Sequence, residues 1–313
     1  MDRGYANFRE CPKGEVRRIS IPRTSVNKGK IPYRGTISRM SGDRTGQLGS
    51  GSVYSFGETD LAAERLRVVS EVFDPTSEAF VSETVRNRPR LALDLGCGPG
   101  FTTRLLSRIA RPERTVGVDR SESFLGRARA SSVAREEYVA ADVAMEPLRV
   151  AGIGERPDLI YARFLASHLP EPERAISGWA KTLEAGGLLL VEEVEGISTE
   201  AAAFEEYLKM LSEVLARHGN ELFVGARLAT ARWGDDLRTE VNRATQVRPS
   251  TGQAARMFSM NLPSWRHDPY VEATYTADEL KKLTAGLDKL TGLADTGRIV
   301  WRMSQLSLRR HPA

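Results

Sequence analysis

Hydrophobic positions between residues 91 and 191 alternate between two spacings. Short strand-like runs lie at 91–95, 115–118, 138–141, 159–162 and 188–191. Between them, apolar residues at helical spacing predict helices over 101–109, 121–133 and 172–183, the last followed by a stop at Gly186. Strands that alternate with helices at this distance are typical of a parallel, doubly wound sheet.

A further helix is predicted before the first strand. Its buried face is formed by Ala62, Leu66, Val69 and Phe73. Thr59 or Asp60 supplies the N-cap. We expect Pro75 to stop or kink this helix, because proline lacks the amide hydrogen that the helical ladder requires.

After Gly196 the pattern changes. The spacing predicts helices over 199–218 and 276–290 and a late strand over 298–308. Residues 221–270 form a mixed segment in which neither helical nor strand spacing is sustained. The predicted domains are an arm over 1–52, N-terminal lid helices over 53–88, and a core over 89–313 with lid or substrate insertions at about 199–290.

Positive charge gathers at the start of the chain. The 313 residues carry a formal charge of +4, but residues 1–50 hold 11 Lys and Arg against 4 Asp and Glu, which leaves 34 against 37 for the rest. The first 52 residues lack a sustained period, so we predict a flexible basic arm there. Because the remainder is net negative, a nucleic-acid partner is not favoured.

Cysteine usage and hydropathy indicate a reducing, aqueous environment. Two cysteines give no basis for a disulfide framework, and the longest apolar run, Leu188–Val191, is too short to cross a bilayer. We therefore expect a cytoplasmic protein without a membrane partner. The sequence leaves the oligomeric state open, a homodimer included.

A glycine-rich turn follows the first predicted strand. Asp94, Gly96, Gly98 and Gly100 lead into a helix at Phe101. Glycines at alternate positions permit positive φ angles and let a ligand approach the backbone. A dinucleotide fingerprint has glycine where this chain has Phe101, and no Walker-type Gly-Lys-Ser/Thr follows, so neither of those phosphate loops is favoured.

Two more acids end predicted strands. Asp119 follows the second strand and Asp142 the third. A carboxylate at a strand end can accept both hydrogen bonds of a ribose diol. The alternative for each acid taken alone is a helix N-cap.

Taken together, these residues resemble the class I S-adenosylmethionine-dependent methyltransferases, whose first motif reads Asp-x-Gly-x-Gly-x-Gly. Asp94, Asp119, Asp142 and the segment 157–195 recur in the family's order, with Ala185 where proline is common. The resemblance implies an α/β, doubly wound, mostly parallel seven-stranded sheet of Rossmann-like type with a helical lid. It also implies S-adenosylmethionine as cofactor.

The resemblance further implies a cofactor site across four strand ends. Asp119 would bind the ribose, Asp142 and the Val143 amide the adenine, and Asp94 would orient the glycine turn or the ligand's ammonium through water. The end of the fourth strand would lie beside the methionine part. The expected cofactor-binding residues are Tyr54, Asp94, Gly96, Gly98, Gly100, Asp119, Arg120, Asp142, Val143 and Arg163.

Tyr54 enters that set because a Tyr-x-x-Gly precedes the first helix in a subgroup of the family. The resemblance implies that Tyr54 helps to close the pocket. The alternative is an apolar staple against the helix.

Two histidines are candidate bases for methyl transfer. His168 lies six residues past the fourth strand, and an imidazole suits proton transfer near neutral pH. The alternative is that its His-Leu-Pro is a structural element. His267 is the other candidate: segment 261–271 could line a substrate pocket, with His267 oriented by Asp268. The alternative is that this segment is a surface loop with one buried tryptophan. No metal is expected, since the acids near 192–195 are too closely spaced to count as ligands.

The leading hypothesis is S-adenosylmethionine-dependent methyl transfer to a small organic acceptor. Oxygen is the favoured acceptor atom, and a secondary metabolite is the expected class of substrate. The alternatives are an RNA or protein methyltransferase, and a cofactor-binding cyclase or scaffold that transfers no methyl group.

Overall fold

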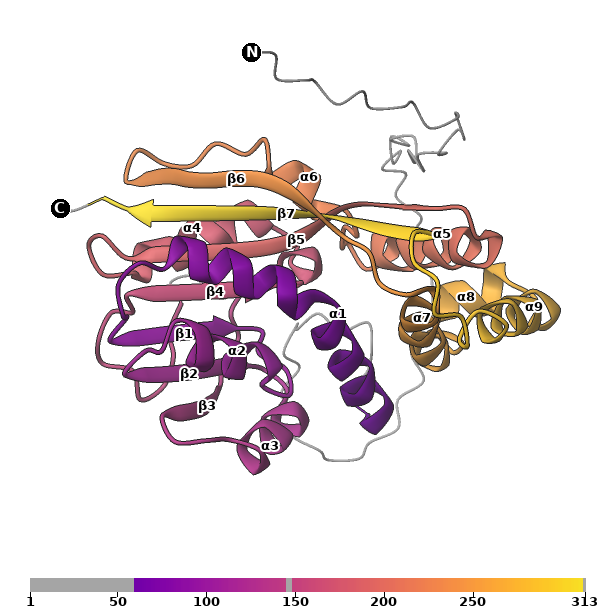
Figure 1. Cartoon of the computed structure of the whole chain (residues 1–313), viewed down its shortest axis with the longest axis horizontal. Coiled ribbons are helices and arrows are strands. Elements are labelled where there is room, and N and C mark those ends of the chain that lie inside the picture. Colours follow the sequence, from indigo (N-terminus) through magenta and orange to yellow (C-terminus); the bar gives the residue numbers. More distant parts are fainter. Residues whose placement is uncertain (1–58, 145–147, 312–313) are drawn as a thin grey trace, which may run out of the picture.

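A computed structural model describes residues 59–144 and 148–311. The predicted arm over 1–52 and Tyr54 lie outside these residues. Within the described part, seven strands form one sheet in the order β3-β2-β1-β4-β5-β7-β6 (Figure 1). The strands are β1 Leu91–Leu95, β2 Arg114–Asp119, β3 Glu136–Ala140, β4 Leu159–Arg163, β5 Leu188–Thr199, β6 Leu237–Val247 and β7 Ile299–Arg310.

The pairing of the strands confirms the predicted fold class. Strands β3, β2, β1, β4 and β5 pair in parallel, whereas β7 is antiparallel to both β5 and β6. Parallel strands end at the same edge of a sheet, so the turns after β1, β2, β3 and β4 lie together there. A mostly parallel, doubly wound, seven-stranded sheet therefore brings the predicted cofactor residues to one edge.

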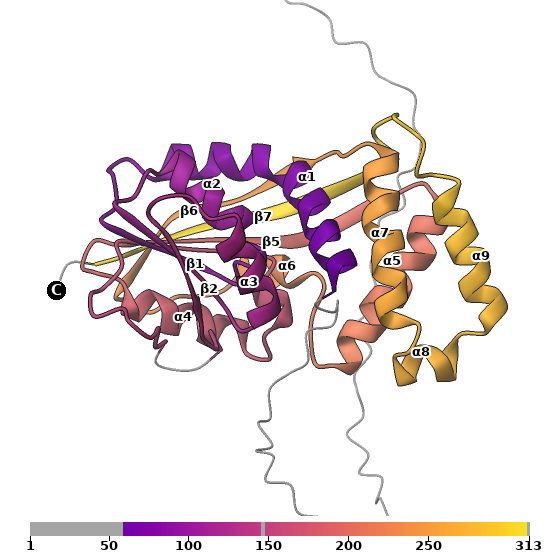
Figure 2. The same ribbon diagram turned by 90° about the horizontal axis from the view of Figure 1, so that it is seen from below.

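Helices cover both faces of the sheet (Figure 2). Helices α1 and α2 pack on one face, where Phe80 and Leu105 contact the β1, β4 and β5 side chains. Helices α4 and α6 cover the other face, with Trp179 and Leu228 in its core. The helices of this part are α1 Asp60–Thr84, α2 Phe101–Ile109, α3 Glu122–Ala130, α4 Pro172–Thr182 and α6 Val224–Leu228.

Helix α1 continues through Pro75 and bends there (Figure 1). The kink predicted from proline is confirmed, and the alternative stop is wrong. Thr59 caps the helix by accepting a hydrogen bond from the Ala62 amide at 3.2 Å. The second half of α1 lies on the sheet, while the first half turns towards the carboxyl ends of the strands. In the described residues, the predicted lid helices of 53–88 are this single helix.

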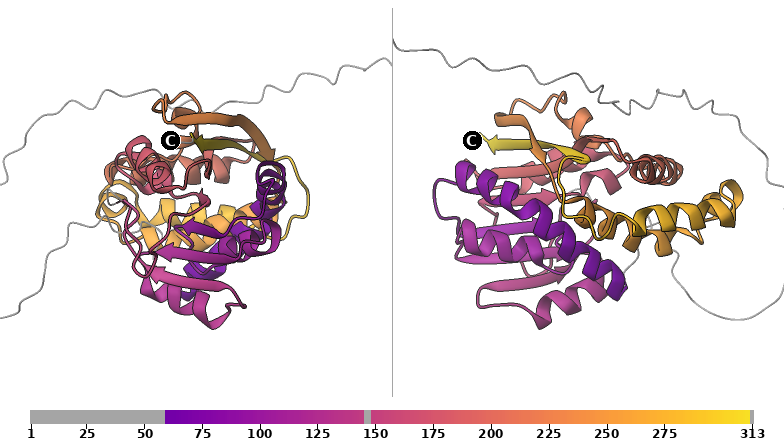
Figure 3. Two further views of the ribbon diagram at one scale, coloured as in Figure 1. Left: turned by 90° about the vertical axis from the view of Figure 1, so that its left-hand side faces the viewer. Right: turned by 45° about the vertical axis from the view of Figure 1, so that its right-hand side comes forward.

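A helical layer extends from one end of the sheet (Figure 3). It consists of α5 Ala202–Arg217, α7 Thr251–Trp265, α8 Pro269–Thr274 and α9 Ala277–Asp288. Strands β5 and β7 extend as a pair towards this layer. They are paired from Leu188 opposite Arg309 to Thr199 opposite Ile299. The range 199–290 also contains β6, the edge strand of the sheet, and α6, which packs on the sheet. The helical layer is therefore divided into α5 before β6 and α7, α8 and α9 after it.

Candidate functional site

The glycine turn after β1 has the backbone that its sequence predicts. Gly96, Gly98 and Gly100 have φ angles of +69°, +52° and +83°. Residues with a Cβ rarely adopt these values. At Gly96 an added Cβ would also lie 2.9 Å from Leu165 Cδ1. The turn therefore requires glycine both for its conformation and for its close approach to the loop after β4.

Asp94 lies beneath this turn. Its side chain is buried, and Oδ2 accepts hydrogen bonds from the hydroxyls of Thr102 and Thr103 at 2.6 and 2.7 Å. Burial raises the pKa of Asp94 to about 6, and the two hydroxyl bonds oppose that rise. These contacts hold the start of α2 and so orient the glycine turn. A water-mediated contact with a ligand stays a prediction.

Asp119 ties the glycine turn to the end of β2. Its Oδ2 accepts a hydrogen bond from the Gly98 amide at 2.8 Å, and its Oδ1 accepts one from the Ser121 amide at 2.9 Å. Desolvation raises the pKa of Asp119, while these amides lower it. The carboxylate also lines the cavity described below. Because each carboxylate oxygen can accept more than one hydrogen bond, it retains capacity for a ligand.

The loop after β3 contributes Asp142 and Val143 to the same cavity. Asp142 is exposed, and its Oδ1 accepts a hydrogen bond from the Ala144 amide at 2.9 Å. Val143 is buried, and its carbonyl accepts a hydrogen bond from Trp179 Nε1 at 2.8 Å. Arg120, which follows β2, is exposed and lines the cavity too. The structure thus brings these three predicted residues together at one edge.

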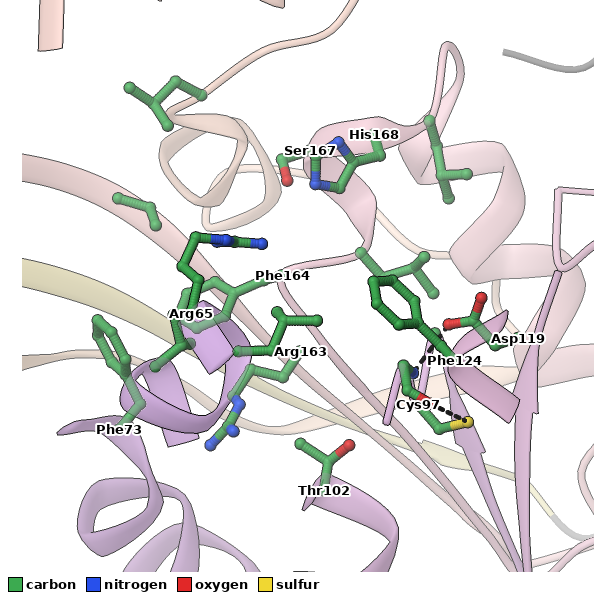
Figure 4. Close-up of a pocket in the computed structure, with 18 of the residues that line it drawn as sticks. Arg65, Phe73, Cys97, Thr102, Asp119, Phe124, Arg163, Phe164, Ser167 and His168 are labelled. Carbon is green, nitrogen blue, oxygen red and sulfur yellow. Dashed lines mark hydrogen bonds between the residues drawn. The ribbon is translucent and has the colours of Figure 1, made fainter. Parts of the chain in front are cut away.

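Arg163 has a different partner from the one that the sequence predicts. Its side chain is buried, and Nη1 donates hydrogen bonds to Asp74 Oδ1 at 3.0 Å and to Ser77 Oγ at 2.9 Å. Both partners flank Pro75 in α1. In Figure 4 the Arg163 guanidinium points away from Asp119. Although Arg163 borders the cavity, its polar contacts attach the bend of α1 to the end of β4.

The next residue, Phe164, has a φ angle of +56°. A left-handed conformation is unusual for an aromatic residue and is often found at functional sites. The Phe164 ring lines the cavity and packs edge-to-face on Phe73 of α1, with centroids 4.9 Å apart. Its amide donates to the Glu192 carbonyl at 3.0 Å. Strand β4 is therefore followed directly by a strained residue that lines the cavity.

His168 ends a short 3₁₀ turn over Ala166–His168 and lines the cavity. Burial lowers its pKa to about 4, and the charges of Arg65 and Arg120 add to that effect. The imidazole is therefore neutral at pH 7. Glu193 of β5 holds the turn from behind, since its Oε1 accepts a hydrogen bond from the Ala166 amide at 2.5 Å. Figure 4 shows His168 and Arg65 at the same cavity.

His267 lies away from this cavity. Its side chain is 79% exposed, and Nδ1 lies 3.4 Å from Glu272 Oε1. The predicted orientation by Asp268 is wrong: Asp268 caps α8 by accepting from the Tyr270 amide, and its other oxygen lies 2.8 Å from His218 Nε2. Segment 261–271 is the end of α7 and the start of α8, so His267 falls on an exposed connection between helices.

Among the described residues predicted to bind the cofactor, Asp94 and Gly100 do not line the cavity at this edge, whereas the others do: Gly96, Gly98, Asp119, Arg120, Asp142, Val143 and Arg163. Phe164 and His168 also line this cavity, which has a volume of about 390 Å³. This volume is within the range of small-molecule sites. Polar groups of the strand ends form one part of the wall. Apolar side chains form the other part, which we call the apolar chamber. The chamber is lined by Val69 and Phe73 of α1, Val194 and Ile197 of β5, Tyr207, Leu208, Leu211 and Leu215 of α5, Leu222 before α6, Met257, Phe258 and Asn261 of α7, and Trp301 of β7.

Sequence reasoning missed most of the apolar chamber. Its residues on α5 and α7 were predicted only as part of the lid or substrate insertions at about 199–290, and none of them was singled out. One available signal was Ser250 followed by Gln253, which form a capping box at the start of α7. That box would have placed α7, but not its distance from α5.

The described residues contain neither a metal-ligand cluster nor a membrane-spanning helix. Over residues 59–144 and 148–311, no cluster of three or more His, Cys, Asp or Glu side chains could hold a metal ion. None of the helices in the same residues has the length and apolar character needed to span a membrane.

Comparison with known families identifies the central part of the chain. Residues 93–191 match the family described as a methyltransferase domain. The chain contains a methyltransferase domain. The matched residues run from β1 into β5 and include the glycine turn, Asp119, Asp142 and His168. This result confirms the resemblance to class I S-adenosylmethionine-dependent methyltransferases.

Curated relatives match over part of their length. A trans-aconitate 2-methyltransferase of Methylobacterium radiotolerans is 37% identical over 105 residues, which cover 33% of this chain and 38% of that protein. One from Rhodopseudomonas palustris is 32% identical over 160 residues, which cover 47% and 57%. Both matches span less than two thirds of the relative. Among solved structures, the YcgJ protein of Bacillus subtilis gives a TM-score of 0.47 at 15% identity, over 76% of this chain and 100% of that one.

The methyltransferase domain offers a site that fits S-adenosylmethionine. At Gly98, positive φ and the lack of a side chain leave the backbone open beside the cavity. Asp119 lines the same cavity, and a carboxylate there would be able to accept hydrogen bonds from the ribose diol of a nucleoside. Asp142 and Val143 line the next part of the wall. These four residues would hold the adenosine portion.

Proposed function

We propose that this protein transfers a methyl group from S-adenosylmethionine to an oxygen atom of a small organic acceptor. The observation that carries the proposal is the continuity of the cavity. Strand-end residues such as Asp119 and apolar side chains such as Trp301 line the same space. A cofactor and a small acceptor can therefore lie side by side in it.

When bound, the cofactor supplies an activated methyl group on a sulfonium. The protein has to align the acceptor with that group and exclude water. The first half of α1 contributes Arg65, Leu66 and Phe73 to the cavity wall, and most of the remaining wall away from the strand ends is apolar. This arrangement supports methyl transfer inside a largely dry site.

The charges around the cavity favour an acceptor with a carboxylate. Arg65 is 7% exposed and lines the wall near His168, whose pKa it helps to lower. A histidine with a pKa of about 4 is a weak base, so it is poorly suited to deprotonate an alcohol. A carboxylate oxygen is already ionised at pH 7 and needs no base.

The curated relatives are consistent with this choice, because they are named for methylation of trans-aconitate, a small acid. From the apolar chamber we infer that the acceptor of this protein also has an apolar body. We therefore propose methyl-ester formation on a small carboxylic acid, with Arg65 near the acid group. His168 would border the reacting atoms as a neutral side chain.

The test begins with binding of S-adenosylhomocysteine to the full chain by calorimetry, followed by a mass-spectrometric screen for methyl esters over aliphatic and aromatic acids. Phenols, amines and RNA serve as competing acceptor classes. Asp119→Ala should weaken S-adenosylhomocysteine binding at least about tenfold, as expected for loss of charged hydrogen bonds. Asp158→Asn is a matched control, because Asp158 bonds the Arg90 and Leu91 amides at the opposite end of β1. Methylation of RNA alone would contradict the proposal.

A further inference from the structure

One polar pair interrupts the apolar chamber. Asn261 of α7 is 5% exposed, and its Nδ2 donates a hydrogen bond to the Tyr207 hydroxyl of α5 at 2.7 Å. Both residues line the cavity. Among the described residues of the chamber wall, the other side chains are hydrocarbon, sulfur or aromatic groups without a carboxylate or amide.

The pair has unused hydrogen-bonding capacity. None of the described residues donates a hydrogen bond to Asn261 Oδ1, although this oxygen is buried. If the amide were turned by 180°, Tyr207 would donate to the oxygen and the amide nitrogen would lack a partner instead. One polar amide atom is therefore unsatisfied in either orientation. A buried polar atom without a partner lowers stability and calls for an explanation.

The surroundings of Tyr207 hold the pair in place. Its ring is fully buried and stacks on Phe258, with centroids 3.9 Å apart and planes 16° apart. Burial raises the pKa of the Tyr207 hydroxyl, which therefore stays protonated. With the amide oriented as in the structure, Nδ2 donates to Tyr207, and none of the described residues accepts the hydroxyl hydrogen. In this orientation the pair offers one acceptor, Asn261 Oδ1, and one donor, the Tyr207 hydroxyl, from two packed helices.

We infer that Asn261 and Tyr207 recognise a second polar group of the acceptor, a hydroxyl that both donates to Asn261 Oδ1 and accepts from Tyr207. This inference rests on the proposed function and specifies its substrate class as a hydroxylated carboxylic acid with an apolar body. Neither residue contacts the reacting atoms in this scheme. They set specificity, because an acid without the hydroxyl leaves the amide oxygen unpaired.

Matched pairs of acids test this assignment. The probes are 3-phenylpropanoate with 3-(4-hydroxyphenyl)propanoate, octanoate with 8-hydroxyoctanoate, and cyclohexanecarboxylate with 4-hydroxycyclohexanecarboxylate. Dissociation constants are measured by calorimetry on the full chain saturated with S-adenosylhomocysteine. We expect the hydroxylated member of at least one pair to bind about tenfold more tightly. Asn261→Leu should abolish that preference, and Tyr207→Phe should reduce it.

Ser259→Ala is the matched control. The Ser259 hydroxyl lies on the same helix and is also buried without a partner in the described chain, but Ser259 does not line the cavity. This variant should keep the preference of the parent protein. Equal binding, or no binding, of both members of every pair would overturn the inference, as would a preference that persists in Asn261→Leu.

The melting temperature without acceptor gives a second readout. If the pair serves recognition, Asn261→Leu removes an unsatisfied polar group, so the melting temperature should stay the same or rise. A clear fall would show that the pair is structural and would overturn the inference. S-adenosylhomocysteine binding separates the two proposals: its absence from the parent protein contradicts the methyltransferase function, whereas its presence without any preference among the acids contradicts only the role of Asn261 and Tyr207.

Discussion

Replacement of Arg163 by methionine separates a structural role from a ligand-binding role. The structure assigns the guanidinium to Asp74 and Ser77 on either side of Pro75, whereas the sequence predicts a cofactor contact. Methionine keeps much of the apolar stem and removes both hydrogen bonds. We expect Arg163→Met to lower stability substantially while S-adenosylhomocysteine binding falls by less than about tenfold.

The size of the stability loss follows from the contacts. A hydrogen bond between charged groups contributes about 1.5–3 kcal/mol, and the bond to Ser77 adds about 1 kcal/mol. The Asp74 side chain is 24% exposed and can regain some water, so the loss stays below the upper part of the ~3–5 kcal/mol range for breaking a buried pair. The two contributions together give an expected decrease of about 2.5–4 kcal/mol in the free energy of unfolding. For a chain of this size, that equals a melting-temperature decrease of roughly 5–15 °C.

Urea and thermal unfolding measure this loss, and calorimetry measures S-adenosylhomocysteine binding to the same samples. Arg163→Lys is the control, because it keeps the charge but not the geometry of the guanidinium, and its loss should be intermediate. A double-mutant cycle with Asp74→Asn should show a coupling free energy above about 1 kcal/mol. Unchanged stability together with a loss of binding greater than tenfold would refute the structural assignment and restore the role predicted from the sequence.

Three further changes test the site. Gly96→Ala should lower both the melting temperature and S-adenosylhomocysteine affinity, because its φ of +69° and its approach to Leu165 disfavour a Cβ; normal unfolding and binding would contradict this. The pKa of His168 is lowered from 6.5 to about 4, so the native state resists protonation and stability should fall as pH decreases from 6.5 to 4, by at most about 3 kcal/mol. His168→Gln should remove this slope in urea titrations. The pKa of Glu193 is raised from 4.5 to about 8, so stability should fall as pH rises from 4.5 to 8, by at most about 5 kcal/mol, and Glu193→Gln should flatten that change; an unaltered pH profile would argue against the role of burial.

The core of the fold was predictable because its buried strands and amphipathic helices have strong local patterns. Helix α2 and strand β1 have the predicted bounds, and other core elements differ by one to three residues. Strand β5 is the exception, because Glu192 and Glu193 look like the polar end of a strand. Glu192 is nevertheless buried, since it accepts hydrogen bonds from the Tyr161 hydroxyl at 2.6 Å and from Gln305 Nε2 at 2.8 Å. No spacing rule reveals partners that lie 31 and 113 residues away.

Strand β6 was missed for a different reason. It is an edge strand, and most of its side chains are exposed on both sides, including Arg238, Glu240 and Arg243. Without a buried face, its sequence does not alternate between apolar and polar residues. Charged residues that protect a sheet edge thus remove the signal by which a strand is recognised.

The two parts of the functional site also differ in whether neighbouring residues or distant residues in the sequence form them. Gly96 and Asp119 could be predicted because each lies within a few residues of the strand that positions it. Asn261 and Tyr207 are 54 positions apart and meet only because α5 and α7 pack against each other. Sequence proximity also misled the interpretation of His267, whose neighbour Asp268 turns to cap α8 instead.

Similarity to other methyltransferases covers the cofactor part of the site but not the apolar chamber. The matched range, 93–191, contains the glycine turn and the strand ends that would hold the cofactor, but the chamber residues of α5, α7 and β7 all lie after it. Similarity within the range therefore supports the methyl donor and is silent on the acceptor. Because most of the proposed acceptor contacts lie on helices placed between β5, β6 and β7, they can change without disturbing the parallel strands. We therefore expect residues such as Asn261 and Trp301 to select the acceptor of this protein, whose chemistry should follow theirs rather than that of trans-aconitate.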